Sequence, residues 1–172
     1  VPTDEDAKDA LHTSGGTAIL VRKHIGLGPA SEAEPNAYEV VPGRLVSALL
    51  HIPGQGELVC YSAYLTCGTG WAAANRDLAD ALFKHKNGHG KPWLAGGDWN
   101  MDPDEIAATG CPAALNGTIF APEDTETCIT PNCSRILDFY IVDRRVDQMV
   151  DSLKTVTNAN TRPHRPVQLV LK

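Results

Sequence analysis

Residues 94–105 read LAGGDWNMDPDE, an apolar run that ends in two glycines and leads directly into Asp98-x-Asn100. These two polar residues are two positions apart, so on an extended backbone their side chains point to the same side. A carboxylate beside an amide suits a site that orients a water or grips a phosphate. The same pair also suits an ordinary polar turn between a strand and a helix.

The sequence DPDE at 102–105 predicts that a short helix follows this turn. Asp102 can act as the N-cap, Pro103 fits the first helical position, and Glu105 completes a capping box. We expect this helix to end near Gly110.

Short strand-like segments lie on both sides of this stretch. LVSALLH (45–51) and ELVCYSAYL (57–65) are separated by IPGQG, which predicts a hairpin with a longer loop. The other strand-like segments are TAILVR (17–22), PWLAGGD (92–98), RILDFYIVD (135–143) and PVQLVLK (166–172). Glycine, proline and polar residues predict loops at 26–36 and at about 111–134.

The clearest helical pattern is WAAANRDLADALFKHKNG (71–88), in which Trp71, Ala74, Leu78 and Leu82 form one apolar stripe. Gly88 can act as its C-cap. Many strands, few helices and no internal repeat predict an α/β (α+β) fold, a layered β-sandwich flanked by helices. We expect one domain over residues 1–172, with a loosely ordered lead-in at 1–14.

Composition narrows the function classes. The 172-residue chain is 42% hydrophobic and 21% charged and has a formal net charge of −6, which indicates a soluble globular protein without a broad phosphate-binding surface. No apolar run reaches the roughly 18–20 residues that a membrane span needs. A local basic cleft and plain surface charge both stay open, because arginines crowd the last quarter: Arg135, Arg144, Arg145, Arg162 and Arg165.

The five cysteines do not follow zinc-ligand spacing, so no zinc site is predicted. A Cys128–Cys133 loop disulfide stays open beside the simpler interpretation of free thiols in a reducing, intracellular compartment. Since the chain begins with Val1 rather than Met, we also expect that an upstream segment was removed or precedes it.

Polar residues at the ends of predicted strands form a candidate site. They are Tyr64, Asp98, Asn100, Asp138 and His164. Asp98 could act as a general base with Asn100 aiming the water, while Asp138 could fix the tautomer of a phosphate-binding His164. Each residue taken alone is also compatible with an ordinary surface position.

Taken together and in this order, these segments resemble the endonuclease/exonuclease/phosphatase superfamily, which has the DNase I-like fold. GGDWN (96–100) is close to the family's G-D-F-N, SRILDFYIVD (134–143) is similar to its S-x-I-D-Y strand, and PHRPV (163–167) resembles its S-D-H-x-P-V ending. The resemblance implies magnesium-dependent hydrolysis of a phosphoester. It also implies that Tyr64 and His164 contact the phosphate, that Asp98 activates water, and that Asn100 positions the water or the phosphate.

Two departures from the family pattern concern the metal. The family's chief metal ligand is a Glu in a Gln-Glu motif, and an Asn in the first strand supports the same metal site. Neither motif is visible in this sequence. Glu5 lies in VPTDEDA and is not assigned the role of metal ligand. The family's Asp before the final His is replaced by Pro163, which has no carboxylate.

The sequence therefore leaves three functions open. The first is a degenerate, non-catalytic domain that serves as a structural or binding subunit of a larger assembly, and this is the function we expect for the chain as written. The second is a Mg²⁺-dependent phosphodiesterase or endonuclease acting on nucleic acid or another phosphoester. The third is a phosphate-binding module without turnover.

Overall fold

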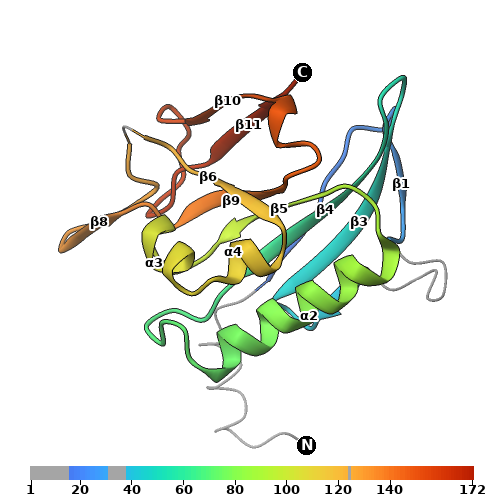
Figure 1. Ribbon diagram of the computed structural model, residues 1–172. Coiled ribbons are helices and arrows are strands. Elements are labelled where there is room, and N and C mark those ends of the chain that lie inside the picture. Colours follow the sequence, from blue (N-terminus) through green and yellow to red (C-terminus); the bar gives the residue numbers. More distant parts are fainter. Residues whose placement is uncertain (1–15, 31–37, 124) are drawn as a thin grey trace, which may run out of the picture.

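A seven-stranded mixed sheet forms the centre of the computed structural model, which describes residues 16–30, 38–123 and 125–172 (Figure 1). The strands run in the order β1-β3-β4-β5-β9-β6, and β2 also pairs with β3. The sheet consists of β1 (Gly26–Gly28), β2 (Glu39–Val41), β3 (Leu45–Ile52), β4 (Gly56–Tyr64), β5 (Trp93–Asp98), β6 (Gly117–Phe120) and β9 (Asp138–Asp143).

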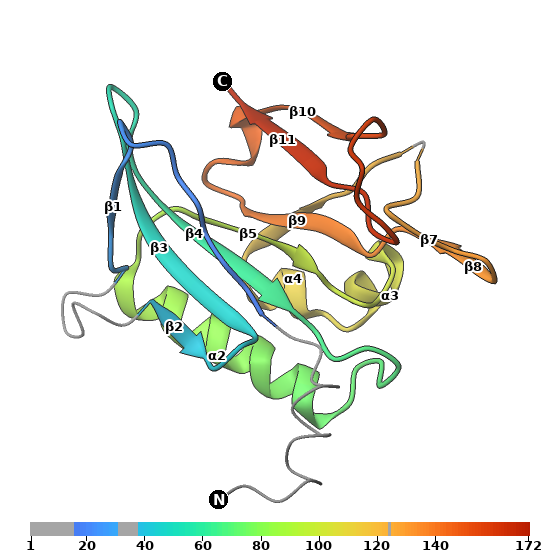
Figure 2. The ribbon, with the colours of Figure 1, turned by 180° about the vertical axis from the view of Figure 1, so that it is seen from behind.

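Smaller elements surround this sheet. Two antiparallel pairs are β7 (Cys128–Thr130) with β8 (Cys133–Arg135), and β10 (Val150–Thr155) with β11 (Val167–Leu171). Within the described ranges the helices are α2 (Ala73–His89), α3 (Pro103–Ala108), α4 (Cys111–Ala114) and the 3₁₀ turn η1 (Asp147–Met149). Helix α2 lies on one side of the sheet, below β3 and β4, whereas β10 and β11 lie on the other side, above β9 (Figures 1 and 2). The expected layered α/β architecture is confirmed.

The β3–β4 hairpin and helix α2 follow the sequence prediction closely. Strands β3 and β4 pair antiparallel along their full length, from Leu45 opposite Ala63 to Ile52 opposite Gly56. Helix α2 then connects β4 to β5, which run parallel, as a crossover helix allows. Its buried Leu78 and Leu82 pack into the core, and each contributes about 2 kcal/mol on full burial.

Two details of helix α2 were predicted wrongly. Ala74 is exposed, and the buried position next to it is Asn75, which is 1% exposed. The Asn75 side chain accepts a hydrogen bond from the Thr66 backbone N–H and donates to the Thr66 carbonyl, and these bonds satisfy its burial. The C-cap is Gly90, at a left-handed φ of 62°, rather than Gly88.

Several predicted loops and strands also differ. Residues 17–22 form no strand, and Leu20 in their middle is 94% exposed, so apolar character alone did not give this segment a pairing partner among the described residues. The predicted loop at 26–36 begins with the strand β1, while residues 31–37 lie outside the described ranges. The predicted loop at 111–134 contains α4, β6 and β7, and β10 was not predicted.

Two tryptophans are buried, and the cysteines range from buried Cys128 to exposed Cys67. Trp93 and Trp99 are 1% and 3% exposed, so both belong to the core. Burial raises the pKa of the Cys60 thiol to about 12 and that of Cys111 to about 11. The side chain of Cys133, and with it the Cys128–Cys133 pairing, lies outside what the structure describes. No helix within the described ranges has the length and apolar character to cross a membrane.

Candidate active site

Three strand ends place the candidate residues in one row. In the pairing register, Tyr64 of β4 is opposite Asp98 of β5, and Asp98 is opposite Asp138 of β9. Residues opposite each other on neighbouring strands have side chains on the same face of the sheet. The row therefore brings together three sequence-predicted residues that are far apart along the chain.

The two glycines before Asp98 are required by close packing. A β-carbon added to Gly97 would lie 2.0 Å from the Ala63 carbonyl oxygen of the neighbouring strand, and one added to Gly96 would lie 2.5 Å from Cε1 of Tyr140. Backbone of β4 and the Tyr140 ring occupy the space that side chains would need. Gly96 and Gly97 thus let β5 reach the row between β4 and β9.

The turn after Asp98 holds the predicted amide. Asn100 has a φ of 48°, a left-handed value that Asn tolerates better than most residues. Its backbone N–H donates to Asp98 Oδ1 over 3.0 Å, and its side-chain Nδ2 donates to the Leu65 carbonyl over 2.8 Å. Between these residues, Trp99 is buried and its Nε1 donates to the Phe139 carbonyl over 3.0 Å. The carboxylate and the amide are fixed beside each other.

His164 joins the row from the segment before β11. Its Nδ1 is 2.8 Å from Asp138 Oδ2, and because an ionised carboxylate only accepts, Nδ1 carries the proton of that bond. Its Nε2 then faces Asp98, with 3.7 Å between Nε2 and Asp98 Oδ2, which is too long for a hydrogen bond. One ligand atom from each of Asp98, Asp138 and His164 lies within 4.8 Å of the others.

Thr127 connects the two segments that carry Asp138 and His164, and the sequence did not indicate this role. It is fully buried, and its Oγ1 accepts hydrogen bonds from the backbone N–H groups of Leu137 and Asp138, each over 2.9 Å. Its own carbonyl accepts from the Arg165 N–H over 2.6 Å. Thr127 therefore ties the start of β9 to the segment that carries His164. A threonine in a loop gives no local signal of this role.

Arg44 is a second residue that the sequence did not single out. Its guanidinium carbon lies 4.7 Å from the centroid of the Tyr64 ring, within the range of a cation–π contact. The Tyr64 N–H also donates to the Arg44 carbonyl. A positive charge thus borders the end of the row at Tyr64.

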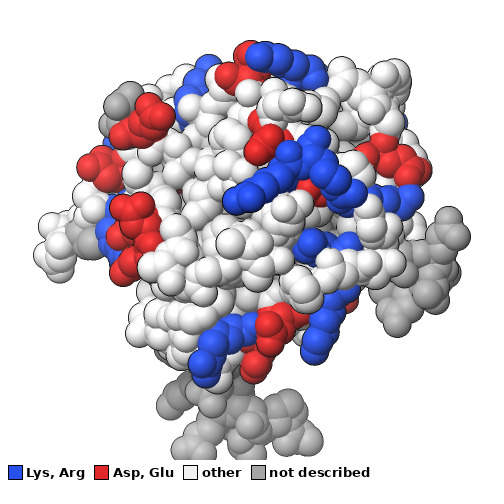
Figure 3. All heavy atoms as spheres, in the orientation of Figure 1, with Lys and Arg blue, Asp and Glu red and all other residues white. Residues whose placement is uncertain are grey.

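The electrostatics of the site distinguish Asp98. Burial raises the pKa of the Asp98 carboxyl above its usual value; the Asn100 N–H lowers it, Asp138 raises it further and His164 lowers it. Because burial is the largest of these effects, Asp98 is a stronger proton acceptor than an exposed aspartate. On the face in Figure 3, acidic and basic side chains are interspersed rather than gathered in one broad basic band.

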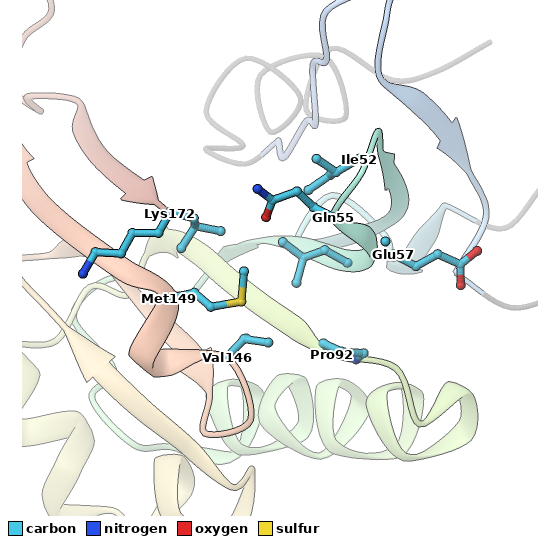
Figure 4. Close-up of a pocket in the computed structure, with 10 residues that line it drawn as sticks. Ile52, Gln55, Glu57, Pro92, Val146, Met149 and Lys172 are labelled. Atoms are coloured by element: carbon cyan, nitrogen blue, oxygen red, sulfur yellow. The ribbon is translucent and has the colours of Figure 1, made fainter.

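A pocket lies elsewhere, lined by residues from the far ends of β3 and β4 and from η1 and β11 (Figure 4). It has a volume of about 330 Å³. In Figure 4 its apolar side chains include Ile52, Val146 and Met149, whereas the charged ends of Glu57 and Lys172 point away. Those two residues pair with Lys91 and Asp151. The pocket offers no converging polar groups, so it is not the candidate active site.

The fold of the chain is similar to the folds of several solved structures. The endonuclease domain of TRAS1, a telomere-specific non-LTR retrotransposon, superposes with a TM-score of 0.71 at 12% identity, over 92% of this chain and 78% of that one. An AP endonuclease from Leishmania major gives 0.58 at 12% identity, over 85% and 60%. The 3′ phosphatase NExo from Neisseria, bound to a product DNA hairpin, gives 0.55 at 16% identity, over 88% and 72%. No protein-family model and no curated protein matches the sequence.

These similarities identify the fold as that of the endonuclease/exonuclease/phosphatase superfamily, the DNase I-like fold. The resemblance inferred from GGDWN and SRILDFYIVD is confirmed at this level. Pro163 lies directly before His164 as the sequence requires, and its carbonyl accepts a hydrogen bond from the Ile129 N–H over 3.0 Å. Glu5 lies outside the described residues.

Proposed function

We propose that this chain is a phosphoester hydrolase that acts on a phosphodiester. The observation that carries the proposal is the convergence of Asp98, Asp138 and His164, from three separate segments, within 4.8 Å. A degenerate site is under no requirement to keep the His164–Asp138 hydrogen bond and the Asp98–Asn100 turn together. Relatives of the same fold are nucleases and a DNA 3′ phosphatase, which supports a phosphoester as the substrate.

Each residue has a role that its contacts support. Asp98 accepts the proton of the attacking water, because its carboxylate is partly desolvated and its pKa is raised. Asn100 orients that water or the scissile phosphate from the neighbouring turn. His164, held by Asp138, donates from Nε2 to the phosphoryl group in its protonated form and stabilises the charge that develops there. Tyr64 contacts the phosphate from β4.

The donor set fits a divalent cation only weakly. The His164–Asp138 hydrogen bond engages one oxygen of Asp138 and one ring nitrogen. The Asn100 N–H engages one oxygen of Asp98, so each carboxylate keeps one oxygen that could ligate. Mg²⁺ commonly uses one or two carboxylates and completes its shell with water and substrate oxygens. The remaining oxygen of Asp138 would hold the ion together with the substrate, and the ion would neutralise charge on the phosphate.

A second candidate function is a non-catalytic domain that binds a partner or a phosphate. Pro163 favours it, because this residue removes the carboxylate that the family pattern places next to the final histidine. With that ligand absent, the site has fewer charges to retain a cation. Protein partners in a larger assembly belong to this second candidate.

The test compares hydrolysis of bis(p-nitrophenyl) phosphate and of abasic duplex DNA, with Mg²⁺ or Mn²⁺, by the wild type and by Asp98→Asn. The matched control is Asp151→Asn, which removes an exposed carboxylate on β10. We expect Asp98→Asn to reduce turnover by about 10²–10⁴-fold, the range for loss of a general base, and Asp151→Asn to leave it unchanged. Absence of turnover in the wild type, or equal turnover in Asp98→Asn, would favour the non-catalytic candidate.

A further inference from the structure

A hollow lies in the helical layer, between α2 and the connection from α3 to α4 (Figure 1). It has a volume of about 290 Å³, near the lower end of the roughly 300–1,000 Å³ that ligand pockets occupy. None of the candidate active-site residues is among the described residues that line it. A space of this size accepts one side chain or a group of similar size.

Two aromatic side chains line this hollow. Trp71 is half-buried and packs against the hydrophobic core, which restricts the motion of its ring. Phe83 belongs to α2 and is 40% exposed. The Nζ of Lys86 lies 5.6 Å from the centroid of the Phe83 ring, so a cation of the chain itself already contacts this aromatic residue. Aromatic rings of this kind attract cations through their faces.

Asp80 is the only charged side chain among the described residues that line the hollow. It is exposed on α2, and Arg76 and Lys84 stand four residues away on either side. Within the described ranges, however, no ion pair engages Asp80. Its carboxylate therefore keeps its acceptor oxygens for a positively charged ligand.

Two further lining side chains contribute polar atoms but no charge. The Thr109 Oγ1 donates to the Ile106 carbonyl over 2.6 Å and accepts from the Cys111 N–H over 3.0 Å. Burial, with a smaller contribution from Asp80, raises the pKa of the Cys111 thiol to about 11, so this thiol is neutral at neutral pH. Recognition of a charged group in the hollow therefore depends on Asp80.

We infer that this hollow is an interaction site for an arginine side chain of a partner protein. A guanidinium group stacks on aromatic faces and forms two parallel hydrogen bonds with a carboxylate, and Trp71, Phe83 and Asp80 line one space. The net charge of −6 favours the approach of a basic partner. Aromatic residues and arginine are also enriched at protein interfaces. The inference does not depend on the proposed hydrolysis.

The test measures binding by NMR through the indole N–H signals of the three tryptophans. The isotope-labelled full chain is titrated with the tripeptide Gly-Arg-Gly, blocked at both ends, and with the same peptide carrying citrulline, the neutral analogue of arginine. Because Trp93 and Trp99 are buried, the signal of Trp71, assigned with Trp71→Phe, reports on the hollow. We expect a saturable shift of this signal and about tenfold tighter binding of the arginine peptide, as for a hydrogen bond to a charged group.

The variants locate the charge that the peptide recognises. Asp80→Asn should weaken binding of the arginine peptide by about tenfold. Asp77→Asn is the matched control, because it removes an exposed carboxylate of the same helix that does not line the hollow, and it should leave binding unchanged. Unfolding curves of both variants check that the fold is intact.

Several outcomes would overturn the inference. The site is refuted if the Trp71 signal shows no saturable shift, if the citrulline peptide binds equally well, or if both variants lose affinity equally. Tighter binding of a blocked Gly-Lys-Gly peptide would overturn the assignment to arginine. Tighter binding of free arginine than of the arginine peptide would overturn the assignment to a partner protein.

Discussion

A pair of histidines on helix α2 and the single His164 differ in how many of their ring nitrogens are hydrogen-bonded within the protein. On helix α2, His85 Nδ1 and His89 Nε2 both lie within hydrogen-bonding distance of the Tyr61 hydroxyl, at 2.8 and 2.7 Å. The other nitrogen of His89 accepts from the Lys91 N–H over 2.9 Å. At the strand ends, His164 has one nitrogen on Asp138, while the other stands 3.7 Å from Asp98.

This difference separates a structural role from a chemical one. The Tyr61 hydroxyl is buried, and its hydrogen bonds to both histidines join the sheet to the helix. Such a network stabilises the fold and has little capacity left for a ligand. His164 is partly exposed, and its Nε2 makes no hydrogen bond with the part of the chain that the structure describes. A histidine is a functional candidate when its second nitrogen is oriented but not already hydrogen-bonded within the protein.

The largest expected effect comes from substituting His164, the histidine with the proposed chemical role. His164→Asn should lower phosphodiester turnover by about 10²–10⁴-fold, because the donor to the phosphoryl group is lost. The free energy of unfolding should change by less than about 1 kcal/mol, as for a partly exposed residue. Hydrolysis assays and urea unfolding measure the two quantities. A large loss of stability with no change in turnover would assign His164 to the structural group.

The next effect is a loss of stability when the ion pair of Asp143 and Arg145 is removed near the C-terminal end of α2. Asp143 is 1% exposed and pairs with Arg145, whose Nη1 and Nη2 also donate to the carbonyls of Gly90 and Lys91. Arg145→Met should reduce the free energy of unfolding by about 2–3 kcal/mol, since it leaves a buried carboxylate unpaired. Arg144→Met is the matched control and should change it by less than about 0.5 kcal/mol. Equal free energies of unfolding for the two variants, measured with urea, would contradict this account.

A smaller effect is expected from Tyr61→Phe. This change removes one hydroxyl and leaves His85 Nδ1 and His89 Nε2 without it, which should destabilise the fold by about 1–2 kcal/mol. Turnover should stay unchanged, in contrast to His164→Asn. If Tyr61→Phe reduces turnover while the unfolding midpoint is unaltered, the two histidine groups are not distinct in function.

The smallest effect is a dependence of stability on pH. Burial lowers the pKa of His89 from 6.5 to about 4, and His85, Lys91, Arg145 and Lys86 add to this effect. The unfolded chain therefore takes up a proton near pH 6.5, whereas the folded chain does so only near pH 4. Stability is complete above that range and falls as the pH drops through it, by about 1–2 kcal/mol after allowance for partial exposure.

His89→Gln tests this dependence, because glutamine keeps a donor for Tyr61 and does not titrate. The free energy of unfolding of the wild type should decrease between about pH 7 and about pH 5, and that of the variant should decrease less. Equal decreases in both proteins would attribute the pH dependence to other groups.

Much of the fold was predictable because its longer elements have strong local patterns. Strands β3 and β4 and helix α2 each combine a run of apolar residues with a turn or cap signal. The three-residue strands β1, β2 and β7 carry too little pattern, and they form because a neighbouring strand offers its edge. Residues 17–22 show the reverse case, since a good apolar run finds no strand partner among the described residues.

The candidate site was partly predictable for a different reason. Asp98 and Asn100 follow a strand through an unusual glycine pair, and Asp138 and His164 lie in segments similar to known motifs; their chemical roles remain predictions. The contribution of Thr127 depends on three segments that meet only in the folded chain. The sequence around residue 127 contains no local pattern that indicates these contacts.

The register of β4, β5 and β9 sets the tolerance of the site to changes in chain length. Because Tyr64, Asp98 and Asp138 are aligned through backbone hydrogen bonds, deleting one residue within any of these strands would turn its site residue to the opposite face of the sheet. Insertions in the connections, such as the segment from Thr66 to Ala72 before α2, leave that alignment intact. The strand register thus fixes the relative positions of the site residues, and the lengths of the connecting loops can vary without changing those positions.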